Sequence, residues 1–83
     1  MNLERSILSL LNESPGSVMS GKYLFETLNI ELPEAVTHTM LRTSLIGLEA
    51  KREIVSVRDE DRGTAPDFLV YQITTIGKAR LAK

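Results

Sequence analysis

Residues 45–55 read LIGLEAKREIV and residues 68–77 read FLVYQITTIG, and together they decide the fold of this chain. Leucines at helical spacing run without a break into the β-branched residues Ile54 and Val55, so a helix is expected to lead directly into a strand. The intervening residues 59–67 are polar and contain glycine and proline, which is typical of a loop. Alternation returns at 68–73, so the pattern predicts a helix followed by an antiparallel hairpin.

Two amphipathic helices are predicted upstream of this stretch. Apolar residues recur at helical spacing in the first of them: Leu3, Ile7, Leu10 and Leu11. Ser14-Pro15-Gly16 ends this helix, and a short extended piece follows at 17–19. Ser20 is a suitable N-cap for the second helix, and Asn29 is a suitable C-cap.

The third helix is predicted to run from Pro33 to Lys51, because proline is favoured at the first helical position. Its buried stripe is expected to contain Leu41, Leu45 and Leu48, extended back to Val36 or Thr37. The opposite face carries polar side chains: His38, Thr39, Arg42 and Thr43. A short final helix is expected after Thr74 or Thr75.

Length and composition indicate one small domain over residues 1–83. The chain has no cysteine and one histidine, so it offers neither a cysteine zinc site nor a pair of histidines for a metal. We find no nucleophile–base pair and no credible cofactor loop, and we therefore expect a protein that is not an enzyme and has no cofactor or metal. The N-terminus lacks the pattern of a signal peptide, and no apolar run is long enough to span a bilayer, so we expect a cytoplasmic protein without membrane contact.

Several motifs in this order resemble those of the winged helix-turn-helix superfamily. The start of the second helix is similar to the opening of the helix-turn-helix, and it reads Ser20-Gly21-x-x-Leu24. The end of the third helix resembles a recognition helix leading into a wing strand, and it reads Leu45-x-x-Leu48-Glu49. The return strand is similar to the close of the wing in PadR-like and MarR-like repressors, and it reads Tyr71-x-Ile73-Thr74-x-x-Gly77. Arg52 or Glu53 stands where such proteins usually have a glycine.

This resemblance implies an α+β fold in which a three-helix bundle carries a two-stranded antiparallel wing and a short C-terminal helix. It also implies a DNA-binding transcriptional regulator or accessory factor of bacterial or phage origin, whose third helix enters the major groove of double-stranded DNA. The residues expected to contact bases are His38, Thr39, Arg42 and Thr43. Those expected to contact the DNA backbone are Ser20, Lys22, Lys51, Arg52, Arg58 and Arg62.

Arg42 is the best candidate for reading a base, because a guanidinium can bond both guanine acceptors in the major groove. A solvated arginine on an exposed helix face would give the same pattern. His38 has two interpretations of equal weight, a donor to DNA or an ordinary packed or solvent-facing residue.

The formal net charge of −1 and the acidic run Asp59-Glu60-Asp61 oppose binding to phosphates. They favour an alternative function, a winged-helix module that binds a protein partner through its acidic wing. A homodimer is a further expectation, because a small domain without disulfides often gains stability from a second copy. Leu8 would then either reach a dimer interface or pack against the final helix.

Overall fold

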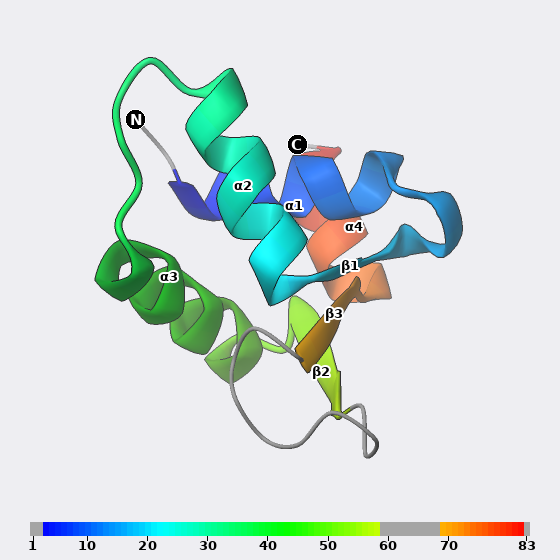
Figure 1. Cartoon of the computed structure of the whole chain (residues 1–83). Helices are drawn as coiled ribbons and strands as arrows, with labels where there is room; N and C mark the ends of the chain where they lie inside the picture. The colour runs from blue at the N-terminus through cyan, green and yellow to red at the C-terminus, as the bar shows by residue number, and fades with distance from the viewer. Residues whose placement is uncertain (1–2, 59–68, 83) are drawn as a thin grey trace.

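The computed structural model describes residues 3–58 and 69–82, and within them the chain forms four α-helices and one three-stranded antiparallel sheet (Figure 1). In chain order the elements are α1 (Leu3–Glu13), a 3₁₀ turn (Pro15–Ser17), β1 (Val18–Ser20), α2 (Gly21–Glu31), α3 (His38–Ala50), β2 (Ile54–Arg58), β3 (Leu69–Ile73) and α4 (Thr75–Leu81). The α+β class, the β2–β3 hairpin and the short final helix are therefore confirmed. None of the helices in these two ranges has the length and apolar character needed to cross a membrane.

Hydroxyl side chains begin three of the helices. Their N-caps are Ser20 for α2, Thr37 for α3 and Thr74 for α4. The Ser20 hydroxyl accepts a hydrogen bond from the backbone N–H of Tyr23 at 3.2 Å, which confirms the predicted cap. Each cap satisfies one of the backbone donors that a helix start leaves without a partner.

The predicted start of the third helix at Pro33 is wrong, because α3 begins at His38. The side chain of Asn29 explains the difference. It accepts a hydrogen bond from the N–H of Val36 at 2.8 Å and donates one to the carbonyl of Val36 at 3.1 Å, so the segment between α2 and Thr37 stays non-helical. Asn29 is also not the predicted C-cap, since α2 continues to Glu31.

The prediction of a two-stranded wing is also wrong, because the sheet has three strands in the order β1-β3-β2. The short extended piece after the first helix pairs with β3, with Val18 opposite Gln72 and Met19 opposite Tyr71. On the other side of β3, Ser56 lies opposite Tyr71. The hairpin strand β3 is thus central, and both of its edges are hydrogen-bonded.

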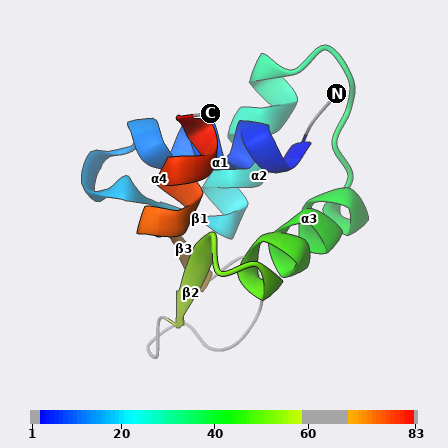
Figure 2. The ribbon, with the colours of Figure 1, turned by 180° about the vertical axis from the view of Figure 1, so that it is seen from behind.

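The core lies between the helices and one face of this sheet. The predicted α3 stripe is confirmed, and the buried apolar residues are Ile7, Leu8, Leu10, Leu11, Leu24, Leu28, Val36, Leu41, Leu45, Leu48, Ile54, Tyr71 and Ile73. Leu8 is fully buried, and α1 and α4 lie side by side (Figure 2). A Cβ atom on Gly77 would lie 3.1 Å from Leu8 Cδ2, so Leu8 packs against the final helix rather than a second copy.

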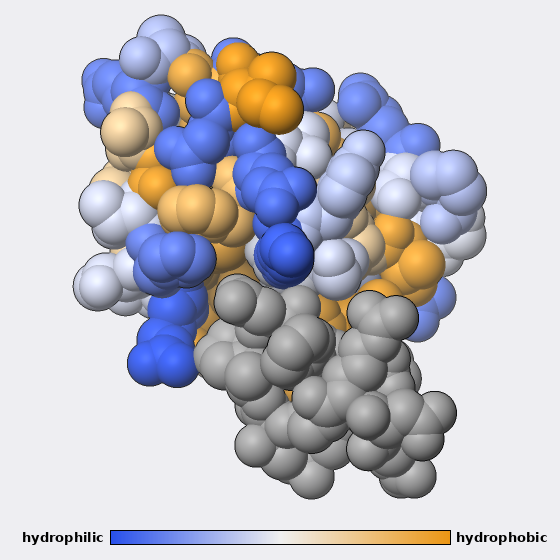
Figure 3. All heavy atoms as spheres, in the orientation of Figure 1, coloured by the Kyte–Doolittle hydropathy of each residue, from blue (hydrophilic) through white to orange (hydrophobic). Residues whose placement is uncertain are grey.

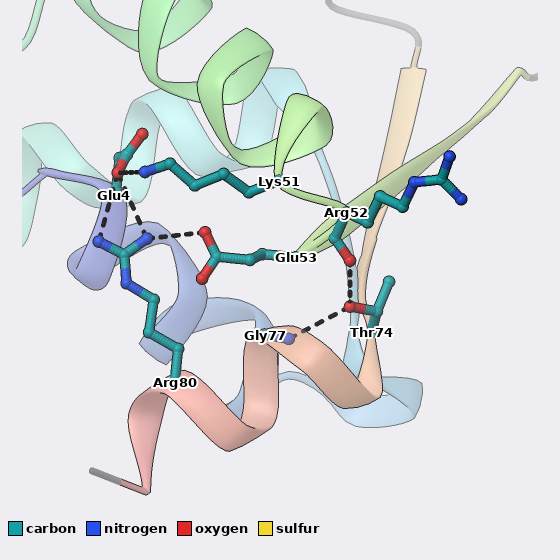
Figure 4. Close-up of polar contacts among 7 residues, drawn as sticks. All are labelled: Glu4, Lys51, Arg52, Glu53, Thr74, Gly77 and Arg80. Atoms are coloured by element: carbon teal, nitrogen blue, oxygen red, sulfur yellow. Dashed lines mark hydrogen bonds and ion pairs between the residues drawn. The ribbon is translucent and has the colours of Figure 1, made fainter.

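The turn between α3 and β2 uses a left-handed residue that is not glycine. Arg52 has φ of 61°, and its N–H donates to the carbonyl of Glu49 at 2.9 Å, while the N–H of Glu53 donates to that of Leu48 at 3.0 Å. These two bonds are the Schellman arrangement that ends many helices. The Thr74 hydroxyl donates to the Arg52 carbonyl at 2.6 Å, which joins this turn to the start of α4 (Figure 4).

A cluster of charged side chains joins the first, third and last helices (Figure 4). Arg80 lies 2.8 Å from the buried carboxylate of Glu53 and 3.3 Å from Glu4, and Lys51 lies 2.9 Å from Glu4. The hydrogen bond from Lys51, aided by its charge and by Arg80, lowers the pKa of Glu4 although partial burial opposes the shift. Burial acts to lower the pKa of Arg80, but the hydrogen bonds to Glu53 and Glu4 outweigh it and raise that pKa.

Candidate nucleic-acid interface

The outward face of α3 carries the candidate base-contacting residues. Since Leu41, Leu45 and Leu48 turn into the core, the exposed positions are left on the other side of the helix. Thr39, Arg42 and Thr43 are all exposed there. Ile46 follows them on the same face with 62% of its surface exposed.

His38 is oriented by an aromatic neighbour at the first position of α3. Its ring stacks on Phe25 of α2, with the ring centroids 4.0 Å apart and the planes 9° from parallel. The residue remains exposed at its outer side. The stack therefore makes His38 part of the α2–α3 contact, and a contact with a base stays a prediction.

The candidate backbone-contacting residues are spread over several elements. Lys22 is exposed in the first turn of α2, next to Ser20, whose hydroxyl is occupied by its capping role. Lys51 points to Glu4 near the start of α1, and Arg52 is exposed at the end of α3. The side chain of Arg58, and all of Arg62 and the acidic run 59–61, lie outside the described residues.

A cavity of about 510 Å³ lies between α3 and the hairpin. Its lining combines apolar and polar side chains: Gly21, His38, Thr39, Leu41, Arg42, Leu45, Ile46, Glu49, Ser56, Leu69 and Tyr71. The structure thus brings three of the four predicted base-contacting residues together at this cavity, whereas Thr43 is not among its lining residues. Hydrophobic surface between hydrophilic side chains is visible on the α3 side of the molecule (Figure 3).

Tyr71 is the functional candidate that the sequence pattern did not single out. It is 4% exposed and lines the cavity from the central strand. Burial raises the pKa of its hydroxyl, the negative charge of Glu49 raises it further, and the positive charge of Arg42 acts in the opposite direction. Both charged side chains of α3 therefore act on the same hydroxyl. In the sequence, Tyr71 was marked only by its place in an alternating strand and in the motif that resembles the close of a wing.

Within residues 3–58 and 69–82, no three histidine or acidic side chains gather closely enough to hold a metal ion. Comparisons of the chain with protein-family models, with curated proteins and with solved structures find no match. The exposed face of α3 and the cavity beside it form the candidate functional site.

Proposed function

We propose that this chain is a winged helix-turn-helix protein that binds double-stranded DNA through α3, as a transcriptional regulator or accessory factor of bacterial or phage origin. The observation that carries the proposal is the exposed face formed by Thr39, Arg42 and Thr43, flanked by the β2–β3 hairpin. An α-helix with its side chains is about 10–12 Å across, which matches the width of the major groove.

The exposure of the Arg42 side chain and its lack of an ion-pair partner in the described ranges support a role in reading DNA bases. Its side chain is exposed, and it makes no ion pair with any part of the chain that the structure describes. The guanidinium is thus free to bond a guanine edge, a contact that contributes about 1–3 kcal/mol of discrimination between bases. Lys22 and Arg52 would hold the DNA backbone on either side of the helix.

A protein-binding module is the second candidate, and a specific observation favours it. Ile46 is 62% exposed on the same face of α3 as Arg42, and Glu49 places a negative charge farther along the helix. An exposed aliphatic side chain beside an acidic group suits a protein surface better than a phosphate backbone. The net charge of −1 agrees with this alternative.

Titration of a random-sequence duplex, followed by fluorescence anisotropy, separates the two candidates. If Lys22 and Arg52 neutralise two phosphates, a fourfold rise in salt should weaken binding about 12-fold. Arg42→Ala should lower the affinity and leave the melting temperature unchanged. Lys78→Ala is the matched control, because it removes the same charge from an exposed position on α4.

Absence of binding at low salt by the folded protein would exclude the DNA role and leave the protein-binding alternative. A collapse of stability in Arg42→Ala would show that the residue is structural. Size-exclusion chromatography with light scattering tests the homodimer, which would let two α3 helices read half-sites about 34 Å apart.

A further inference from the structure

The cavity between α3 and the hairpin has the properties of a small-molecule site. Its volume of about 510 Å³ falls within the range of about 300–1,000 Å³ that is typical of ligand pockets. Apolar atoms supply more of its wall than polar atoms do, and four of the lining side chains are aliphatic: Leu41, Leu45, Ile46 and Leu69. A few polar groups converge on this apolar lining, as they do in sites that fix the orientation of a ligand.

The hydroxyl of Tyr71 offers a donor at this cavity. Tyr71 as a whole is 4% exposed, and its hydroxyl makes no hydrogen bond with any described residue. Since no buried polar side-chain atom in the described ranges lacks a partner, this hydroxyl faces the accessible space of the cavity. A ligand carbonyl within the cavity would give it an acceptor.

Two opposite charges stand beside this hydroxyl. Arg42 and Glu49 lie seven residues apart on α3, which places their backbones about 10 Å apart along the helix axis. Both line the cavity, and neither side chain has an ion-pair partner in the described ranges. The charge of Glu49 raises the pKa of the Tyr71 hydroxyl and that of Arg42 acts to lower it. Both charges therefore act on the tyrosine that lines the cavity from the central strand.

We propose that this cavity binds a free apolar dipeptide, with the carboxylate of the ligand at Arg42 and its ammonium group at Glu49. Two extended residues span about 7 Å, which suits two side chains whose backbones lie about 10 Å apart along the helix axis and which can lean toward each other. The ligand side chains pack against the leucines of the wall, and the Tyr71 hydroxyl donates to the peptide carbonyl.

Arg42 belongs both to this cavity and to the face proposed to contact DNA. The dipeptide and the duplex are therefore expected to compete for one guanidinium, and the ligand should release DNA. This consequence rests on the proposed function, whereas binding of the dipeptide itself does not.

Isothermal titration calorimetry of the full chain, without DNA, tests the site with three matched probes. These are leucyl-leucine, its N-acetyl form and its C-terminal amide, which remove one ligand charge each. Leucyl-leucine should bind at least about tenfold more tightly than either blocked form, the factor expected for one charge-assisted hydrogen bond. In a ¹⁵N–¹H spectrum its addition should shift the amide signals of Arg42, Glu49 and Tyr71.

Two exposed positions provide the charge variants. Arg42→Gln should abolish the preference for leucyl-leucine over its C-terminal amide. Glu49→Gln should abolish the preference for leucyl-leucine over its N-acetyl form. Lys78→Gln, on α4, should leave both preferences intact. Equal binding of all three probes, or no binding of leucyl-leucine, overturns the site. Dipeptide binding by a chain that fails to bind DNA would sustain the site and refute only the DNA role.

Discussion

Replacement of Gly77 by alanine is expected to destabilise the protein, although glycine-to-alanine changes within helices usually stabilise them by about 1 kcal/mol. Gly77 lies in the first turn of α4, where the helix meets the turn after α3. A Cβ atom there would overlap the backbone carbonyl oxygen of Glu53 and would lie 2.8 Å from Ile73 Cγ1. That carbonyl also accepts a hydrogen bond from the N–H of Thr74 at 3.0 Å, so it cannot move away freely.

The magnitude follows from these contacts. Overpacking of a well-packed interior costs about 1–3 kcal/mol, and a clash with the backbone belongs at the upper end of that range. Subtraction of the helix-propensity gain of about 1 kcal/mol leaves a net loss of about 2 kcal/mol. For a domain of this size, such a loss lowers the melting temperature by about 8–16 °C.

Thermal unfolding followed by circular dichroism, with urea titration as a second measure, checks this value. Gly47→Ala is the matched control, because the new Cβ would meet only the carboxylate oxygen of Glu4 at 2.7 Å, the end of a flexible side chain. Its stability should change by less than about 1 kcal/mol, since the helix gain offsets any loss of surface ion pairing. A melting temperature for Gly77→Ala that is unchanged or raised would refute the close approach of α4 to the Glu53 carbonyl.

Three further predictions concern the turns and the charged cluster. Arg52→Gly should raise the free energy of unfolding by about 1 kcal/mol, because glycine adopts the left-handed conformation without strain; a lower value in urea titration would contradict this. Glu4 has a lowered pKa in the folded state, chiefly through its bond to Lys51, so its contribution to stability is present above pH 4.5 and is lost as the pH falls through the folded-state pKa. Melting temperatures across this range should fall less steeply for Glu4→Gln than for the wild type, and parallel curves would count against the linkage. Asn29→Ala leaves the N–H and carbonyl of Val36 without their side-chain partner and should cost about 1–3 kcal/mol, whereas Asn29→Asp, which keeps the acceptor, should lose less.

Local patterns predicted much of the fold because helices, caps and hairpins depend on near neighbours in the chain. The leucine stripe of α3, the Ser20 cap, the β2–β3 hairpin and the final helix were all confirmed. The start of α3 was missed because Asn29 bonds to Val36 across seven residues, a contact that competes with the helix signal of Pro33.

The candidate site was predicted only in part for the same reason. Helical spacing is enough to turn Thr39 and Arg42 away from the core. It cannot show that Tyr71 comes to lie beside Arg42 and Glu49, because that juxtaposition depends on how the hairpin packs against α3. The role of Arg42 toward DNA remains a prediction that the titrations above can decide.

By itself, the sequence determined which segments become helices and strands and which face of each is apolar, since residues a few positions apart carry that information. Tertiary structure decided that residues 18–20 form the third strand, that Glu4, Glu53 and Arg80 meet in one cluster, and that a cavity opens beside α3. Each of these features joins segments that are distant along the chain. Their geometry follows from the packing of complete elements, and no local pattern of residues specifies it.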